Sequence, residues 1–137
     1  MRALAALAAA LALAGCVSVD VDASLTCDVG LKSSTTAELV FGRNIGGVMG
    51  VSDADWKAFL DLEVSPRFPD GLTVYEAAGQ WRGPNGALIA EPSKVLLLVL
   101  SGAPGEAEKV EAIRAAYKAR FRQDSVLLVK RQACVGF

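Results

Sequence analysis

The chain has 137 residues, a formal net charge of −1 and no histidine. This length suits one domain after removal of a leader, and the near-neutral charge without a basic run excludes a typical nucleic-acid-binding surface. The absence of histidine removes the commonest metal ligand and general base, together with every Ser-His or Cys-His nucleophile. We therefore expect no nucleic-acid partner, no bound metal and no cofactor.

The first 16 residues predict an export signal. Met1-Arg2 supplies a positively charged start, and residues 3–14 are all Ala or Leu. A membrane-spanning helix needs about 20 apolar residues, so this apolar run is too short to be one. The segment Leu13-Ala14-Gly15-Cys16 resembles a bacterial lipobox, which implies cleavage before Cys16 and a lipid on its thiol. The alternative is a plain secretory signal cut after Ala14, with Cys16 left as a free thiol.

The cysteine count favours the lipid anchor. Three cysteines in an oxidising compartment leave one unpaired, whereas a lipid on Cys16 leaves Cys27 and Cys134 to form one disulfide. These two cysteines are too few for a thiolate zinc site and lack the spacing of a redox motif.

We accordingly expect a signal peptide at residues 1–15, a lipidated N-terminus and tether at 16–36, and one α+β domain at 37–137. The membrane is then a partner through the lipid on Cys16, and the protein faces the periplasm of the bacterial cell envelope. Val17 follows the anchor, and by resemblance to enterobacterial sorting this favours the outer membrane over the inner one.

The first elements of the domain are a strand and a helix. A strand is predicted at 38–42, and the three glycines of residues 44–50 predict a loop. Ser52 and Asp55 then have the spacing of a capping box at a helix start, and Pro66 ends that helix. Helical spacing is followed by Trp56, Phe59, Leu60 and Glu63-Val64, so we expect Trp56 and Phe59 to face the core.

Two further strands follow. The Pro-Asp-Gly of residues 67–71 predicts a tight turn, and a strand is expected at 73–81. A glycine- and proline-containing loop at 83–86 lets the chain return through Leu88-Ile89. The continuous apolar run at 95–100 is typical of a strand that is buried on both faces.

A second helix begins near Pro104, and a last strand is expected at 125–131. Acidic residues at the helix start and basic residues at its end suit the helix dipole. Tyr117 lies on the apolar stripe, so its ring is expected in the core, while its hydroxyl needs a partner and could reach a cavity. The stripe consists of Val110, Ile113, Tyr117 and Phe121.

The predicted order is β-α-β-β-α-β, the ferredoxin-like arrangement of a four-stranded antiparallel sheet with two helices on one face. Right-handed crossovers place the strands in the spatial order 125–131, 38–42, 95–100, 73–81. The start of the first strand then lies beside the end of the last strand. This topology predicts the disulfide independently of the cysteine count.

Two helices cover only one face of such a sheet, yet the strand at 95–100 is apolar on both. Either the tether and the hairpin at 83–91 cover the second face, or a second subunit packs on it and forms a dimeric α+β barrel. The sequence leaves a monomer and a homodimer equally open, since large exposed apolar patches usually mark an interface.

Several short segments spread over residues 38–137 form a recognisable set, of which Phe68-Pro69-Asp70-Gly71 and Gly79-Gln80-Trp81-Arg82 are the most specific. Others are Phe41-Gly42, Val51-Ser52, Ser93-Lys94 and Gln123-Asp124-Ser125-Val126. Together these segments resemble a bacterial family catalogued as domain of unknown function 3574. The resemblance implies a small exported protein, often with a lipoprotein signal, and it implies no catalytic residues.

Arg67 and Asp70 flank the predicted turn. They are candidates for an anion or carboxylate clamp, since the planar fork of arginine binds such groups bidentately. The turn chemistry favours a structural interpretation, in which Asp70 bonds local backbone and Arg67 is solvated or caps carbonyl groups.

Gln80, Arg82, Glu91 and Lys94 cluster near one end of the sheet if the second and third strands pair as a hairpin. They would then form a polar site beside the Trp81 ring, with Arg82 or Lys94 binding an anionic group and Glu91 acting as acid or base. The structural alternative, which is favoured, is a cross-strand ion pair that holds the hairpin register.

Three functions follow from these observations. The first is a non-catalytic domain of an envelope lipoprotein that binds a small ligand or a protein partner, based on the anchor, the disulfide and the missing histidine. The second is a small dimeric α+β-barrel enzyme that uses Arg82, Glu91, Lys94 or Tyr117 in an apolar cavity. The third is a purely structural envelope protein. A closed apolar cavity with two or more of the four hairpin residues pointing into it would favour this second function, and hairpin side chains splayed into solvent would exclude it.

Overall fold

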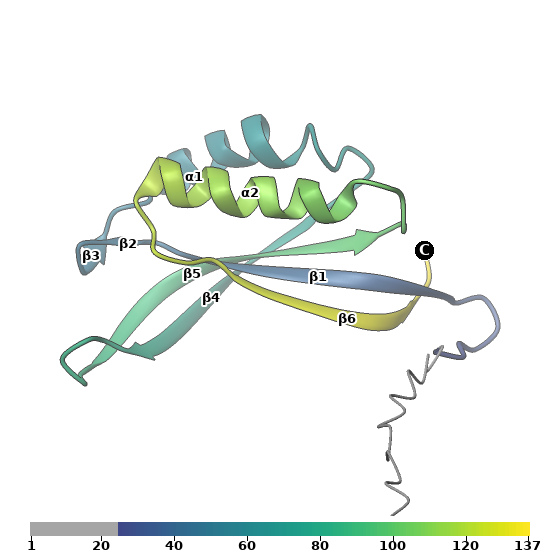
Figure 1. The fold of residues 1–137 in the computed structure, drawn as a ribbon, viewed down its shortest axis with the longest axis horizontal. Helices are drawn as coiled ribbons and strands as arrows, with labels where there is room; N and C mark the ends of the chain where they lie inside the picture. The colour runs from purple at the N-terminus through teal and green to yellow at the C-terminus, as the bar shows by residue number, and fades with distance from the viewer. Residues whose placement is uncertain (1–24) are drawn as a thin grey trace, which may run out of the picture.

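The computed structural model describes residues 25–137, so the predicted signal, Cys16 and the first part of the tether lie outside the described residues. The elements are β1 (Lys32–Gly42), β2 (Asn44–Ile45), β3 (Val48–Met49), α1 (Asp53–Phe59), η1 (Leu60–Val64), β4 (Thr73–Arg82), β5 (Leu88–Leu100), α2 (Glu106–Phe121) and β6 (Leu127–Val135). Four strands form an antiparallel sheet in the order β4-β5-β1-β6, and both helices lie on one face of it (Figure 1). The predicted fold class and strand order are confirmed.

The two central partners of the sheet are longer than predicted. β1 begins at Lys32, which pairs with Val135 of β6, so the Ser/Thr-rich segment expected as tether belongs to the sheet from residue 32 onward. Threonine is β-branched and suits an extended strand. The segment was not predicted as a strand because it has no strong apolar pattern. The expected loop at 44–50 holds the small β2–β3 hairpin.

The first helix starts as predicted and ends differently. The Ser52 hydroxyl accepts the Asp55 N–H at 3.1 Å, and the Asp55 carboxylate accepts the Ser52 N–H at 3.2 Å, which completes the capping box. α1 has only seven residues and continues as the π-helix η1, where the Ser65 N–H donates to the Leu60 carbonyl. Pro66 then prevents further helix.

The core lies between the helices and the sheet. Leu39 and Leu96 from the sheet and Ile113 from α2 are completely buried. Beside them is the aromatic cluster, whose neighbouring ring centroids are 4.7 to 6.0 Å apart. The cluster consists of Phe41, Trp56, Phe59, Tyr117 and Phe121. The predicted core positions of both helices are therefore confirmed.

Cys27 and Cys134 form a disulfide, as predicted. Cys134 lies within β6 and pairs across the sheet with Ser33 of β1, so the bond joins the segment before β1 to the adjacent strand. The crosslink closes a loop with a sequence separation of 107 residues.

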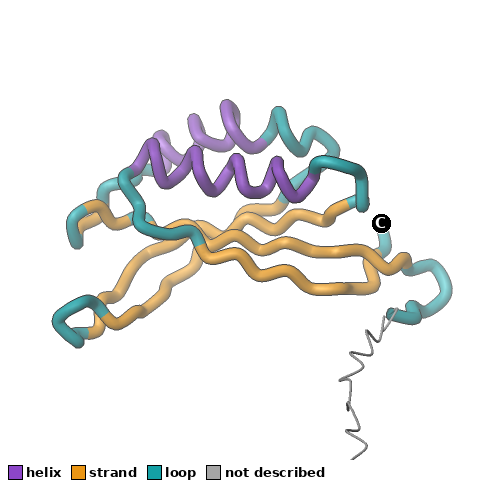
Figure 2. The backbone as a smooth tube through the Cα atoms, in the orientation of Figure 1, coloured by secondary structure: helices purple, strands orange, loops and turns teal. Residues whose placement is uncertain are grey.

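The sheet face away from the helices, called here the open face, is largely apolar. Within residues 25–137, neither the segment before β1 nor the β4–β5 loop covers it, because Tyr75 is 43% exposed and Leu127 is 58% exposed. The β4–β5 hairpin instead continues past the helix layer as a two-stranded arm, with its loop at the far tip (Figure 2). The apolar residues of the open face are Val40, Tyr75, Val95, Leu97, Val99, Leu127 and Val129.

Candidate functional site

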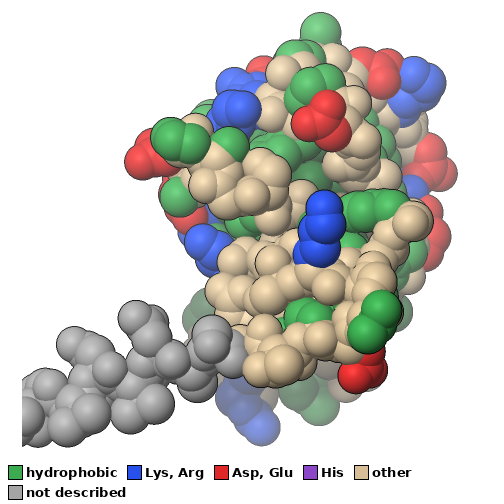
Figure 3. Space-filling view, turned by 90° about the vertical axis from the view of Figure 1, so that its right-hand side faces the viewer, with side chains coloured by type: hydrophobic (Ala, Val, Ile, Leu, Met, Phe, Trp, Pro, Cys, Tyr) green, Lys and Arg blue, Asp and Glu red, His purple; other side chains and the backbone are tan. Residues whose placement is uncertain are grey.

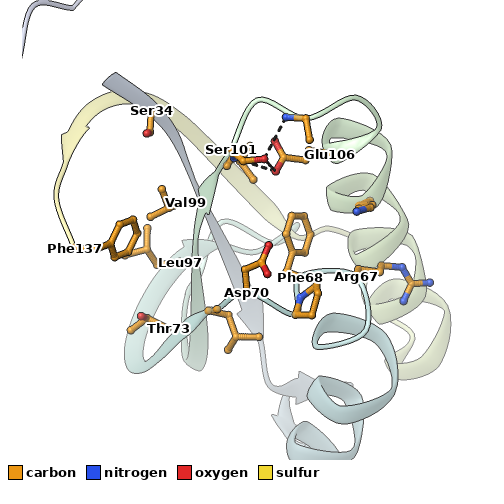
Figure 4. A pocket seen from close by; sticks show the side chains of 16 residues that line it. Ser34, Arg67, Phe68, Asp70, Thr73, Leu97, Val99, Ser101, Glu106 and Phe137 are labelled. Carbon is orange, nitrogen blue, oxygen red and sulfur yellow. Dashed lines mark hydrogen bonds between the residues drawn. The ribbon is translucent and has the colours of Figure 1, made fainter. Parts of the chain in front are cut away.

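A cavity of about 580 Å³ lies where the chain turns from η1 into β4, beside the end of β5 and the start of α2 (Figure 4). The turn is built by Pro69-Asp70-Gly71, and Gly71 has a φ of +151°, a conformation that residues with a side chain rarely adopt. Because β4 starts only at Thr73, opposite Leu97, the last residues of β5 extend beyond it. The cavity occupies the space next to this extension.

Most of the cavity wall is apolar. Phe68 and Leu100 contribute from the core side, and Leu97 and Val99 contribute from the open face. The ring of Phe137, at the end of the chain, lies next to Leu97 at the mouth (Figure 4). Two aromatic rings and branched aliphatic side chains make a wall suited to a flat apolar group.

Two carboxylates give the cavity its charge. The Asp70 carboxylate points into it beside the Phe68 ring, and among residues 25–137 it takes part in no salt bridge (Figure 4). Glu106 accepts bonds from the Ser101 N–H at 3.0 Å and from the Gly102 N–H at 2.9 Å. Burial raises the pKa of Glu106, but these hydrogen bonds outweigh it and hold the pKa below its ordinary value. Glu106 therefore stays ionised at neutral pH.

Two basic residues line the cavity, and each is engaged by another side chain. The Arg67 guanidinium points away from the cavity and pairs with the Glu63 carboxylate at 2.8 Å (Figure 4). The Lys109 ammonium lies over the Phe68 ring, 5.9 Å from its centroid. Arg67 and Asp70 thus form no common anion clamp, because the arginine is held by the helical residue four positions earlier.

Charges of both signs are interspersed on the end of the molecule that Figure 3 shows, without a large patch of one sign. Long-range attraction at this end is consequently weak. Selection of a charged ligand would depend on the carboxylates inside the cavity.

The four hairpin residues of the sequence prediction do not share a site, and their expected clustering is wrong. Glu91 and Lys94 are three positions apart on β5, so their side chains point to opposite faces of the sheet. Arg82 donates to the Gly86 carbonyl within its own hairpin at 2.8 Å, and Gln80 is exposed. None of the four lines the cavity.

Glu91 and Tyr117 make structural contacts. The Glu91 carboxylate accepts the Asn44 N–H at 3.0 Å and lies directly over Gly42, where a Cβ atom would be 2.5 Å from its oxygen. The Tyr117 hydroxyl donates to the Gly42 carbonyl at 2.8 Å, and burial raises the pKa of this phenol well above its ordinary value. Tyr117 therefore finds its partner in the backbone and remains protonated.

Lys94 belongs to a charge cluster that the sequence did not predict. The cluster consists of Arg43, Asp53, Glu76 and Lys94; its two basic side chains are 9% and 8% exposed, whereas its acidic ones are 78% and 68% exposed. Lys94 bonds Asp53 at 2.8 Å and also Glu76, and these bonds raise its pKa. The cluster is electrically balanced and fastens the start of α1 to β4 and β5.

Within residues 25–137, neither helix has the length and apolar character needed to cross a bilayer. In the same part of the chain no three or more Cys, Asp or Glu side chains gather in a way that could hold a metal ion.

A family model described as protein of unknown function (DUF3574) matches residues 36–137. Curated proteins give no match. Among solved structures, a phage SAM lyase in complex with S-methyl-5′-thioadenosine is 19% identical, with a TM-score of 0.61 over 83% of this chain and 97% of the other. The apo state of a phage SAM lyase is 18% identical, with a TM-score of 0.59 and the same coverage. At this identity the likeness concerns the fold.

These comparisons contradict the first functional prediction, that of a non-catalytic binding domain in an envelope lipoprotein. The solved structures that share the fold are those of an enzyme. The prediction relied on the anchor, the disulfide and the missing histidine, and none of these features decides whether a domain is catalytic.

Proposed function

The chain belongs to the DUF3574 family, and we propose that it is a small enzyme whose active site is the cavity between the 67–72 turn, β5 and α2. The observation that carries the proposal is the combination of an apolar, aromatic wall with the carboxylates of Asp70 and Glu106. Enzyme pockets for small ligands have this composition, with few polar groups in a mainly apolar cleft. The fold likeness to a lyase adds support.

The substrate class is a small organic cation with a flat ring. The volume of about 580 Å³ lies in the range typical of pockets for small molecules. The ring would lie against Phe68 or Phe137, and the positive charge would face Asp70. S-adenosylmethionine is a suitable first probe, since it combines an adenine ring with a positively charged sulfonium, and S-methyl-5′-thioadenosine is its neutral counterpart.

Replacement of Asp70 tests this assignment. We expect Asp70→Asn to weaken binding of the sulfonium at least about tenfold and to leave binding of the neutral thioether nearly unchanged, because only the charged ligand loses an attraction worth about 1 to 4 kcal/mol at about 4 Å. Isothermal titration calorimetry with both probes measures the difference, and chromatography of the reaction mixture measures turnover.

The matched control is Asp124→Asn, which alters an exposed aspartate away from the cavity. It should leave both affinities unchanged. Failure of the wild-type protein to bind either probe, or an equal effect of both variants, would contradict the assignment of a cationic nucleoside to this cavity.

We also propose that the enzyme acts outside the cytosol, held at the cell-envelope membrane by a lipid on Cys16. The lipobox-like segment supports this location, as does the disulfide, since such bonds persist in oxidising compartments. The substrate would then be a solute of the envelope. Mass spectrometry of the intact protein from its host should show acyl chains on Cys16 that a Cys16→Ser variant lacks, and an unmodified Cys16 would argue against the anchor.

A further inference from the structure

The open face has the composition of an interface. At its centre, Val95 of β5 is only 5% exposed because it lies between Tyr75 and Val40 on the neighbouring strands. Around this centre the side chains remain accessible, as Leu127 at 58% illustrates. Contiguous exposed apolar surface on a sheet is costly in water unless a partner covers it.

The arm of the β4–β5 hairpin extends this surface. Beyond Gly42, the last residue of β1 that pairs with β5, the hairpin continues without helices above it (Figure 1). Trp81, on the same side as the open face, is 47% exposed on the arm. A projecting arm with an exposed tryptophan is suited to contact a neighbouring molecule, since tryptophan is enriched among residues that dominate binding energy.

The charges on the open face match a second copy of the same surface. Glu38 and Arg131 lie on it side by side, 3.4 Å apart, one acidic and one basic. In a two-fold contact, a residue i of one copy that touches residue j of the other implies that residue j of the first copy touches residue i of the second. Glu38 of each copy can therefore pair with Arg131 of the other, which makes the face complementary to itself.

The area is also adequate. Eight paired positions along β1 and β5, at about 3.3 Å per residue, and four strands about 4.8 Å apart give a flat footprint of roughly 500 Å². The arm adds roughly 200 Å² on the same spacing. Because side chains protrude from the sheet, its accessible surface area is larger than this flat footprint. The area that the face can bury therefore approaches the about 800 Å² per partner that is typical of a stable interface.

We propose that a second copy of this chain packs on the open face and closes the cavity. The cavity opens on this side, since Leu97 and Val99 belong both to its wall and to the open face, and Phe137 stands exposed at its mouth. The neighbouring sheet would form the missing wall and exclude water from the bound ligand. This second part of the proposal rests on the proposed function.

Leu127→Glu tests the interface, because it places a charge on the open face at a residue that does not line the cavity. Leu62→Glu is the matched control, since Leu62 is 64% exposed against 58% for Leu127 but lies on the helix layer. Native mass spectrometry and sedimentation of the full chain in mild detergent measure the oligomeric state. We expect a dimer for the wild type and for Leu62→Glu, and a dissociation constant at least tenfold higher for Leu127→Glu.

Similar melting temperatures of the two variants would show that both fold. The proposal would be overturned by a wild type that is monomeric at roughly 100 µM. At this concentration half of the protein is dimeric if the free energy of dimerisation is about −5.5 kcal/mol. An assembly that Leu127→Glu leaves intact would overturn the proposal too.

Titration of the same samples with S-adenosylmethionine separates the two proposals. Weaker binding by the Leu127→Glu monomer, at least tenfold, is expected if the second copy closes the cavity. Equal affinity of monomer and dimer would overturn the closure, whereas a dimer that binds no nucleoside would overturn the proposed function and leave the interface standing.

Discussion

Removal of the Cys27–Cys134 disulfide should lower the free energy of unfolding by about 2–5 kcal/mol. The crosslink restricts the unfolded chain, and in the chain-entropy model a closed loop of about 100 residues corresponds to about 4.7 kcal/mol. The double variant Cys27→Ser/Cys134→Ser avoids a free thiol. Chemical denaturation followed by circular dichroism measures the loss, which is a large part of the 5–15 kcal/mol typical of a domain.

The control for this experiment is reduction of the wild-type protein. Dithiothreitol should lower the stability of the wild type to that of the double variant and should leave the double variant unchanged. A wild type whose unfolding midpoint is insensitive to reduction would show that the crosslink does not contribute to stability.

Phe41→Ala should cost about 3–5 kcal/mol of stability. Phe41 is completely buried, and its ring centroid lies 4.7 Å from that of Tyr117 and 5.1 Å from that of Trp56. The substitution removes a large apolar side chain and leaves a cavity between β1 and both helices, which the surrounding rings can fill only in part. Thermal and chemical unfolding measure the effect.

Phe137→Ala is the matched control, since it makes the same chemical change at a fully exposed position. It should alter the free energy of unfolding by less than about 0.5 kcal/mol. If Phe41→Ala does not fold, Phe41→Leu should fold with a smaller loss. Equal stabilities of the Phe41→Ala and Phe137→Ala variants would contradict the central role of the aromatic cluster.

The topology was predictable because each element carries a strong local signal. The stripe from Val110 to Phe121 fixes the buried face of α2, and the apolar run at 95–100 identifies the central strand. Right-handed crossovers then allow one strand order, which the structure has. The disulfide followed from this order.

The site was less predictable because it depends on side-chain direction and on where strands begin. Alternation along β5 separates Glu91 from Lys94, although both lie in one short segment. The cavity exists because β4 starts three residues short of the end of β5, a register that no sequence pattern announces. Of the residues around the cavity, Arg67 and Asp70 were singled out in advance because they lie at a recognisable turn, and both were favoured there for a structural role.

The disulfide also determines how the domain would respond to a mechanical load. Tension on the N-terminal side of the described chain reaches Cys27 before it reaches β1, and the bond to Cys134 passes part of it to β6. Two antiparallel neighbours, β1 and the edge strand β6, then bear the force together. Under tension from the N-terminal side, the load is shared between these two strands for as long as the covalent bond is intact.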